Sequence, residues 1–397
     1  MKILFLMMKT GSGHIMPAKS ISSKMNAETI IVDPAREFDC GKTSDCYENI
    51  WKFMLKWPIL YHLSFYVLMT RLGAFFESFA TVNIQKRLGS YIDNIDPDCI
   101  VTTHNAYARM LSKLKKRKRL KKPTFVFATD TVNPHEGWLF KENNYLLLFH
   151  LDEKRKKTLL KRGFAKEQII HVNFPLRPEF QAKSIDTKCM RKTLTLKDTF
   201  TVTILSGGEG IGRIQEFVQP FIDNDDDIQV NVVCGRNEKL KLKLDELSIK
   251  SHCKNLTLNT FGFISNMSDY IHATDLMLGK SGISFMFESL LCKKPIIINQ
   301  TFDNEKPCMN YLIEKGVCLF RTDPGQVHKD VIKLRDNKSA YAKMVRNIET
   351  INIQNGSKEI ADFIATKTRD FANPSPPSRS RSHVERGDPY EEGFSQG

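Results

Sequence analysis

Near its start, the chain reads KILFLMMKT over residues 2–10 and GSGH over residues 11–14. The apolar run is short and suits a β-strand, and the two glycines let the backbone turn sharply into a predicted helix over residues 16–25. In a parallel α/β sheet, such a turn lies at the carboxyl end of a strand, where ligands bind. His14 would then lie at a helix N-terminus beside a binding edge, which makes it a candidate for chemistry as well as for packing.

Short apolar runs alternate with helix-length segments along most of the chain. This alternation predicts parallel sheets built from right-handed βαβ units. The pattern restarts after PLRP at residues 175–178, where two prolines indicate a domain joint. We therefore expect an α/β fold with two Rossmann-like parallel-sheet domains facing each other across a cleft. The expected strands are 2–7, 29–32, 99–103, 124–128 and 145–149, then 200–205, 228–233, 256–260, 275–278, 295–298 and 317–320.

The length of 397 residues also suggests two domains, each able to bury a core. We expect the first over residues 1–178 and the second over 179–338. Helical residues 339–370 would cross back to the first domain. From Asn373 onward the sequence has almost no apolar content, which predicts a disordered tail over about 371–397.

The nine cysteines are odd in number and scattered, with no C-x-x-C pair. This usage is typical of a reducing compartment and argues against a disulfide framework or a structural zinc site. The first predicted strand begins at residue 2, which leaves no room for a signal or transit peptide.

The positive charge is concentrated in the first half of the chain. Residues 1–180 hold 29 Lys and Arg against 17 Asp and Glu, a net +12, whereas the remainder holds 30 against 28, a net +2. This asymmetry indicates an anionic partner on one face, either nucleic acid or a lipid surface. A solubilising surface without a specific partner is the alternative.

Residues 51–82 are dense in aromatic and long aliphatic side chains, and 14 uncharged residues separate Lys56 from Arg71. That run is short of the ~20 residues that a membrane-spanning helix needs. It suits a segment that enters the membrane interface, and a buried core helix or helical hairpin is the alternative. The residues that we assign to membrane or acceptor contact here are Trp51, Trp57, Tyr61 and Phe65.

A basic run, KLKKRKRLKK, occupies residues 113–122 and holds eight basic residues in ten. Basic clusters attract anionic lipid headgroups, by ~1 kcal/mol per charge near the surface. They also bind nucleic-acid phosphates, but no nucleic-acid-binding motif accompanies this run. We favour the membrane surface over nucleic acid, with contacts from Lys115, Lys116, Arg117, Lys118 and Arg119.

A second glycine loop, SGGEGIG at residues 206–212, directly follows a predicted strand and opens a helix. Backbone N–H groups at such a turn form an anion site suited to a diphosphate. The spacing fits neither the dinucleotide fingerprint nor the P-loop. Tight packing between strand and helix also uses glycine at such turns.

A third such turn reads LGKSGIS at residues 278–284, and Glu288 lies one to two turns into the helix that follows. A carboxylate there can accept both hydroxyls of a ribose while the helix N-terminus holds a phosphate. A solvated glutamate is the alternative, but Phe285, Met286, Leu290 and Leu291 around it are apolar.

The motifs occur in an order that resembles the diacylglycerol glycosyltransferases, namely the monogalactosyldiacylglycerol synthases and the bacterial diacylglycerol glucosyltransferases. The resemblance covers about residues 1–365. It rests on GSGH at 11–14, ATD at 128–130, PLRPEF at 175–180, GEG at 208–210, CGRN at 234–237, GF at 262–263, KSG at 280–282 with Glu288, and the segment from Glu305 to Asn310.

The resemblance implies a GT-B fold, with an N-terminal domain for the lipid acceptor and a C-terminal domain for a UDP-sugar. Gly262 and Phe263 would flank the uracil, Glu288 would bind the ribose, and Glu305 and Asn310 would lie near the sugar hydroxyls. The diphosphate would be held by the two glycine loops. The full expected donor-binding set is Gly207, Gly208, Glu209, Gly210, Arg236, Asn237, Gly262, Phe263, Lys280, Ser281, Gly282, Ile283, Ser284, Glu288, Asn304, Glu305 and Asn310.

Members of this family invert the anomeric centre by direct displacement, which needs a general base and a stabilised leaving group. His14 is our first choice of base, and Asp130 would orient His14 or act as the base itself. We expect no cofactor and no metal, because helix dipoles and loop amides can stabilise the diphosphate and no Asp-x-Asp pair is placed for a metal.

The predicted activity is transfer of galactose or glucose from a UDP-sugar to diacylglycerol, by a peripheral protein on the cytoplasmic side of a membrane rich in anionic lipid. The family usually has Lys-Pro-Gly or Lys-Ala-Gly followed by Gly-Thr where this chain has KSGIS at 280–284, and a Gln-Glu pair where it has Asn304-Glu305. These departures leave the donor sugar open. The alternatives are a transferase for another lipid-linked acceptor and a UDP-binding membrane protein without catalysis.

Overall fold

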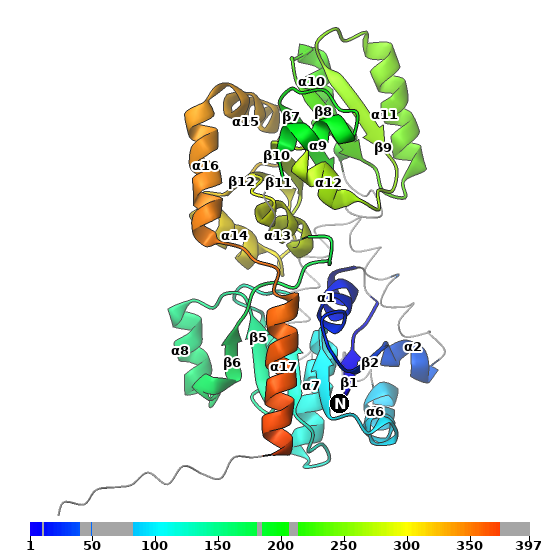
Figure 1. The fold of residues 1–397 in the computed structure, drawn as a ribbon, viewed down its shortest axis with the longest axis vertical. Helices are drawn as coiled ribbons and strands as arrows, with labels where there is room; N and C mark the ends of the chain where they lie inside the picture. The colour runs from blue at the N-terminus through cyan, green and yellow to red at the C-terminus, as the bar shows by residue number, and fades with distance from the viewer. Residues whose placement is uncertain (10–11, 40–48, 50–81, 181–184, 206–212, 374–397) are drawn as a thin grey trace, which may run out of the picture.

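The computed structural model describes residues 1–9, 12–39, 49, 82–180, 185–205 and 213–373. Two six-stranded sheets, each with helices packed against it, lie one beyond the other along the long axis of the molecule (Figure 1). Every pairing in both sheets is parallel. This arrangement confirms the predicted fold class.

The first sheet has the strand order β2-β1-β3-β4-β5-β6. Its four inner strands are mostly apolar and buried, because helices cover both faces of the sheet, and Ile3 to Leu6 of β1 are fully buried. The strands are β1 (Lys2–Leu6), β2 (Glu28–Val32), β3 (Cys99–Thr102), β4 (Thr124–Phe127), β5 (Tyr145–Leu148) and β6 (Ile169–His171). The helices of this part are α1 (Ser12–Ser22), α2 (Pro34–Asp39), α6 (Val82–Ile95), α7 (Asn105–Lys116), η1 (Glu136–Trp138), α8 (Glu153–Lys161) and η2 (Lys166–Gln168).

The second sheet has the order β12-β11-β10-β7-β8-β9, in which β7 and β10 are central neighbours. Its strands are β7 (Thr201–Leu205), β8 (Gln229–Val233), β9 (Thr257–Phe261), β10 (Leu276–Lys280), β11 (Ile296–Gln300) and β12 (Cys318–Phe320). The helices of this part are α9 (Thr187–Thr193), α10 (Ile214–Asn224), α11 (Glu238–Ser251), α12 (Met267–His272), α13 (Ile283–Leu291), α14 (Lys306–Glu314), α15 (Pro324–Asp336) and α16 (Lys338–Ile351). A further helix, α17 (Ser357–Ala372), follows them in the chain and packs against α1 of the first part.

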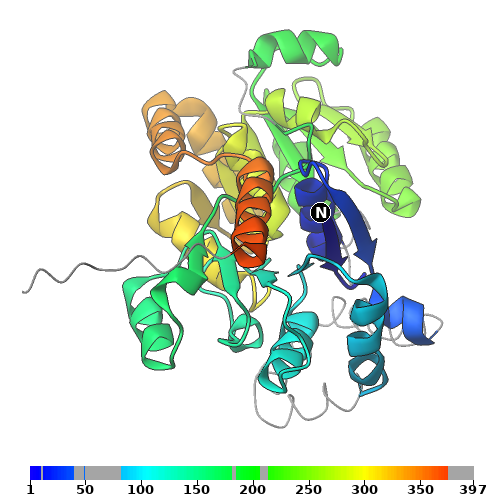
Figure 2. The ribbon, with the colours of Figure 1, turned by 60° about the horizontal axis from the view of Figure 1, so that its bottom comes forward.

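The chain crosses between the two sheets twice, and the two crossings are bonded to each other. The Nδ2 of Asn355, in the second crossing, donates to the carbonyls of Leu176 and Phe180 in the first, at 3.0 and 2.8 Å. Helix α17 then runs back along the first domain (Figures 1 and 2), where Phe363 meets the rings of Phe125 and Tyr145 edge-on. The two domains are therefore joined by a paired linker and a returning helix.

A continuous apolar core also passes from one domain to the other. Phe287 of α13 stacks on Phe174 of the first crossing, with ring centroids 5.1 Å apart, and meets Phe149 edge-on at 4.9 Å. Phe174 in turn contacts Phe127 of β4. Because these aromatic rings are buried or half-buried, they hold the helix that carries Glu288 against the first domain.

All eleven predicted strands are present, and three local predictions need correction. A twelfth strand, β6, is only three residues long and gave no periodic signal. Helix α1 begins at Ser12, earlier than the predicted residue 16. The helical stretch predicted over 339–370 consists of two helices, because Asn352 takes a left-handed conformation (φ 53°) at the end of α16.

Candidate functional site

Three neighbouring strands of the first sheet end beside one another, and polar side chains follow each of them. β1, β3 and β4 are adjacent, and His14, Thr103 and Asp130 come after them in that order. Because the strands are parallel, their carboxyl ends meet at one edge of the sheet. The structure thus places both predicted catalytic residues, His14 and Asp130, at the same edge.

Thr103 fixes His14 through both its backbone and its side chain. The Nδ1 of His14 lies 2.6 Å from the Thr103 carbonyl oxygen, and the Thr103 hydroxyl donates to the His14 carbonyl at 2.7 Å. The Thr129 hydroxyl lies 3.2 Å from the same Nδ1. A carbonyl oxygen only accepts hydrogen bonds, so Nδ1 carries a proton and, in the neutral ring, Nε2 carries the lone pair. The ring nitrogen of His14 that can accept a proton is therefore Nε2.

Burial lowers the pKa of His14, although the Thr103 carbonyl and the charge of Asp130 oppose this shift. The imidazole is then neutral at neutral pH, which is the form that can accept a proton. The ring of His104 lies beside it, with centroids 4.5 Å apart. Burial and the proximity of His14 lower the pKa of His104 well below its ordinary value, so this neighbour also stays uncharged.

Asp130 is buried and accepts hydrogen bonds on both carboxylate oxygens. Trp138 Nε1 and His135 Nε2 lie 2.8 and 3.1 Å from Oδ2, and Asn304 Nδ2 lies 2.9 Å from Oδ1. Burial alone would raise the pKa of Asp130, but the hydrogen bonds outweigh it and keep that pKa below its ordinary value. Asp130 is thus a bound anion rather than a group poised to take a proton.

The expected orienting contact between Asp130 and His14 needs correction. The ring nitrogen through which His14 is oriented, Nδ1, is bonded to Thr103 and Thr129 instead. The interaction between Asp130 and His14 is electrostatic, since the carboxylate charge raises the pKa of the imidazole. A negative charge at this place would stabilise a protonated His14.

The second domain brings two predicted donor-site residues to the same place. The Asn304–Asp130 hydrogen bond joins the loop after β11 to the loop after β4, so the carboxyl edges of the two sheets meet here. Next to Asn304, Glu305 Oε2 lies 2.6 Å from the hydroxyl of Ser281, which follows β10. Burial raises the pKa of Glu305 to about 7, although nearby Lys280 opposes the shift. Glu305 can therefore both donate and accept hydrogen bonds near neutral pH.

Glu288, the expected ribose ligand, is buried and paired with Arg177 of the first crossing. Arg177 Nε and Nη2 lie 2.9 and 3.1 Å from the two carboxylate oxygens, in a bidentate arrangement. Burial raises the pKa of Glu288 in spite of this partner. A ribose bound to Glu288 would therefore share the carboxylate with Arg177 or displace it, and this pairing was not predicted.

Two other expected donor residues are exposed at the carboxyl ends of β8 and β9. The guanidinium of Arg236 lies 5.3 Å from the centroid of the Phe263 ring, and the residue Phe263 is 63% exposed. A Cβ on Gly262 would lie 3.9 Å from the Gly235 carbonyl, so the two loops are close neighbours. An exposed aromatic ring with an adjacent cation suits a planar, anionic ligand such as a nucleotide.

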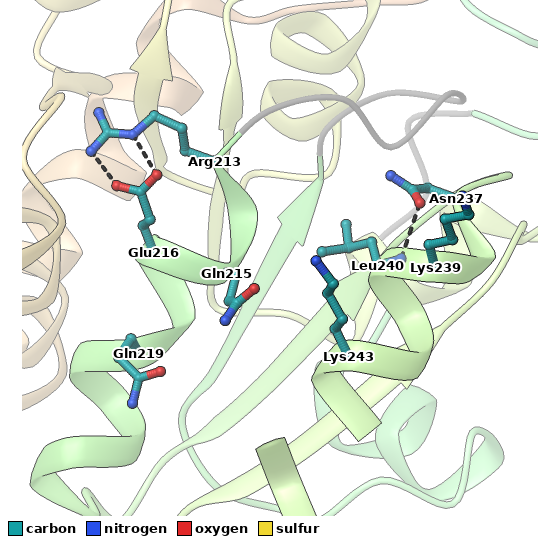
Figure 3. A pocket seen from close by; sticks show the side chains of 8 residues that line it. All are labelled: Arg213, Gln215, Glu216, Gln219, Asn237, Lys239, Leu240 and Lys243. Atoms are coloured by element: carbon teal, nitrogen blue, oxygen red, sulfur yellow. Dashed lines mark hydrogen bonds and ion pairs between the residues drawn. The ribbon is translucent and has the colours of Figure 1, made fainter. Parts of the chain in front are cut away.

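A hollow of about 720 Å³ lies between the starts of α10 and α11, and Figure 3 shows the side chains that line it. Arg213 and Glu216 bond to each other on one side of it, and Asn237 on the other side caps α11 by accepting from the Leu240 amide at 3.0 Å. Of the described residues that we predicted to bind the donor, only Asn237 lines this hollow.

The remaining predicted residues are dispersed or lie outside the described residues. Gly282, Ile283 and Ser284 form the half-buried start of α13, and Asn310 is exposed on α14. Lys280 Nζ lies 5.8 Å from the Phe302 ring centroid. The residues outside the described ranges are Gly207, Gly208, Glu209, Gly210, Trp51, Trp57, Tyr61 and Phe65, together with the tail from 374.

The basic run lies at the end of α7 that precedes β4, and therefore at the amino-terminal edge of the first sheet. His14 lies at the opposite, carboxyl edge. Lys116 to Arg119 are exposed, whereas Lys115 is half-buried and burial lowers its pKa to about 8. The run thus presents charge on a face remote from the catalytic candidates.

Several residues of this site were missed from the sequence, namely Thr103, His104, Thr129, His135 and Trp138. The segment TDTVNPHEGW at 129–138 concentrates polar and aromatic residues directly after a predicted strand. That cluster was a usable signal, because side chains that follow a parallel strand face the binding edge.

Comparison with solved structures identifies the fold. MurG from Acinetobacter baumannii superimposes with a TM-score of 0.58 at 10% identity, over 92% of this chain and 100% of that one. HepE from Anabaena, solved in complex with UDP, gives 0.55 at 12% identity, over 93% and 100%. At these identities the likeness concerns the fold alone, and the chain has the two-domain GT-B fold.

Family models then match both halves of the chain. The model for monogalactosyldiacylglycerol (MGDG) synthase matches residues 14–176, and that for the glycosyltransferase family 28 C-terminal domain matches residues 201–362. Together the two models cover most of the chain and confirm the resemblance to the diacylglycerol glycosyltransferases, and the chain is a glycosyltransferase.

Curated relatives extend over most of the chain. A processive diacylglycerol beta-glucosyltransferase of Bacillus mycoides is 25% identical over 368 residues, which are 87% of this chain and 90% of the relative. Monogalactosyldiacylglycerol synthase 2, chloroplastic, of Arabidopsis thaliana is 26% identical over 347 residues, 83% and 72% respectively. Within the part of the chain that the structure describes, no helix combines the length and apolar character needed to cross a bilayer.

Proposed function

We propose that this protein transfers glucose or galactose from a UDP-sugar to diacylglycerol with inversion at the anomeric carbon. The names of its relatives support diacylglycerol as the acceptor, since they are a diacylglycerol glucosyltransferase and a monogalactosyldiacylglycerol synthase. The observation that carries the proposal is the geometry of His14, whose lone pair is on Nε2 beside a buried anion where the two domains meet.

In the proposed reaction, Nε2 of His14 takes the proton of the acceptor hydroxyl. The hydroxyl oxygen forms a bond to the anomeric carbon from one face while the bond to the UDP oxygen breaks on the other, so the configuration inverts and UDP leaves. The imidazolium that results lies in the field of Asp130, and this attraction lowers the barrier to proton transfer.

We propose that the departing diphosphate needs no metal. Arg236 and Lys280 supply positive charge in the second domain, and the start of α13 supplies backbone N–H groups with Gly282 at its N-cap. The proposal also places the protein peripherally on the cytoplasmic face of an anionic membrane. The exposed residues Lys116 to Arg119 support contact with an anionic surface, although they lie at the edge of the first sheet opposite His14. The aromatic segment 51–82 of the sequence supports entry into the membrane interface.

The test is incubation of the purified protein with diacylglycerol in phosphatidylglycerol-containing vesicles and radiolabelled UDP-glucose or UDP-galactose in parallel. The proposal predicts a labelled glycolipid with one of the two donors, and chelation by EDTA should leave the rate unchanged. Absence of product with both donors while UDP still binds would overturn diacylglycerol as the acceptor. It would favour another lipid-linked acceptor or a protein without catalysis.

A further inference from the structure

Both ring nitrogens of His135 have defined partners, and these fix its tautomer. Its Nδ1 accepts the backbone N–H of Gly137 at 3.1 Å, as the cap of the short helix η1. Since Nδ1 carries the lone pair, Nε2 carries the hydrogen, and Nε2 lies 3.1 Å from Oδ2 of Asp130. His135 therefore donates a hydrogen bond to the carboxylate and does not need to be charged to do so.

The turn that carries His135 is built around this contact. Trp138, at the other end of η1, is buried and donates to the same Oδ2 at 2.8 Å. Between them, Glu136 pairs with Arg155 and Arg162 and so ties the turn to α8. A Cβ on Gly137 would come within 2.7 Å of the His135 ring, so the turn closes tightly against the imidazole.

Asp130 in turn faces the reacting groups of both domains. Its other oxygen, Oδ1, accepts the amide of Asn304 from the second domain, next to Glu305. The titratable groups that interact with Asp130 come from several elements, namely His14, His104, His135, Glu305 and Cys308. The orientation of this one carboxylate therefore affects both the proposed base and the loop expected to hold the sugar.

We propose that His135 is a positioning residue of the transfer reaction, which holds Asp130 in the orientation that faces His14 and accepts Asn304 from the donor domain. This role rests on the proposed function, because it supposes that His14 takes the acceptor proton. His135 itself exchanges no proton in the reaction. Its loss would let the carboxylate rotate away from both partners and weaken the stabilisation of the His14 imidazolium.

Two substitutions separate positioning from a role in the turn alone. His135→Asn keeps an oxygen near the place of Nδ1, which can still cap η1, but cannot reach Asp130. His135→Gln places an amide N–H near the position of Nε2 and keeps the Asp130 contact, but loses the cap. His328→Asn is the matched control. His328, on α15 of the second domain, also pairs its Nε2 with a carboxylate, that of Asp226, at 2.6 Å.

We expect His135→Asn to lower kcat by about tenfold to a hundredfold, as for loss of a hydrogen bond to a charged group, while KM for the donor changes less than threefold. The acid limb of its kcat/KM profile, which reports the pKa of His14, should move to lower pH, because the displaced carboxylate stabilises the imidazolium less. His135→Gln should restore most of the lost kcat, although its melting temperature falls more. In an Asp130→Asn background, His135→Asn should have no further effect on kcat, and His328→Asn should leave kcat unchanged.

Full activity of His135→Asn would overturn the proposal. So would equal losses of kcat in the Asn and Gln variants with matching losses of melting temperature, since both would then report only the turn. An additive loss in the Asp130→Asn background would also contradict it. If the wild-type protein makes no glycolipid, the proposed function itself is refuted. If the wild-type protein makes glycolipid and the His135 variants make it at the same rate, only the role of His135 is refuted.

Discussion

Replacing Arg177 with alanine should destabilise the protein more at high pH than at low pH. Arg177 is the bidentate partner of Glu288, whose side chain is 9% exposed, and its removal leaves a buried carboxylate without its cation. Breaking a buried pair in this way costs about 3–5 kcal/mol. Arg177 is itself 23% exposed, so water can replace part of the interaction, and we expect about 3 kcal/mol at pH 8.

The pH dependence follows from protonation of Glu288. Burial already raises the pKa of this carboxyl above its ordinary value of 4.5, and loss of Arg177 should raise that pKa further. A carboxyl with a higher pKa in the folded state binds more protons there than in the unfolded chain, so stability falls as pH rises between the two values. At low pH the folded variant can protonate Glu288 instead of burying an unpaired charge. At pH 5.5, protonating a carboxyl of ordinary pKa costs roughly 1.4 kcal/mol, so the loss of stability in Arg177→Ala at pH 5.5 should be about half of that at pH 8.

The assay is thermal and urea denaturation of wild-type, Arg177→Ala, Glu288→Gln and the double variant at pH 5.5 and pH 8. Glu288→Gln removes the charge that Arg177 neutralises, so the double variant should be less destabilised at pH 8 than the sum of the two single variants. An equal loss for Arg177→Ala at both pH values, with additive effects in the double variant, would refute the coupling between these two side chains.

Two other predictions concern Glu305 and the linker. Burial raises the pKa of Glu305 to about 7, so the charged carboxylate destabilises the folded wild-type protein at pH 8 but not at pH 5. The change in unfolding free energy caused by Glu305→Gln, measured by urea denaturation, should therefore be more favourable at pH 8 than at pH 5 by roughly 2–3 kcal/mol. An equal effect at the two pH values would contradict a buried carboxyl there. Gly356→Ala would place a Cβ 1.9 Å from the Asn173 carbonyl oxygen, so it should lower the free energy of unfolding by about 2 kcal/mol or more and make the paired linker sensitive to limited proteolysis. A variant as stable and as protease-resistant as wild type would show that the two crossings are not packed this closely.

The sequence was sufficient for features that depend on local pattern. Apolar runs such as 2–6 and 99–102 become buried parallel strands because nothing but a two-sided core accommodates them. The glycine turn at 11–13 predicts the placement of His14 at a helix start, and the structure has His14 in the first turn of α1. The strand β6 was missed because three residues show no period.

The pairings inside the site could not be read from the sequence, because they join distant segments. Arg177 and Glu288 are 111 residues apart, and Asp130 and Asn304 are 174 apart. Such contacts depend on how two complete domains meet, which no local pattern encodes. The carbonyl of Thr103 that orients His14 is a backbone group, so no residue type could have predicted it. His135 and Trp138 lie close to Asp130 in sequence and could have been proposed from their position after a strand.

The most direct test of the proposed chemistry is the single-turnover rate of His14→Ala with UDP-sugar and diacylglycerol vesicles, with exposed His171→Ala as the control. If Nε2 of His14 takes the acceptor proton, the rate should fall at least about a hundredfold while UDP affinity stays the same. His171→Ala should retain the wild-type rate. A His14→Ala protein that turns over within threefold of wild type would contradict the central role of this histidine.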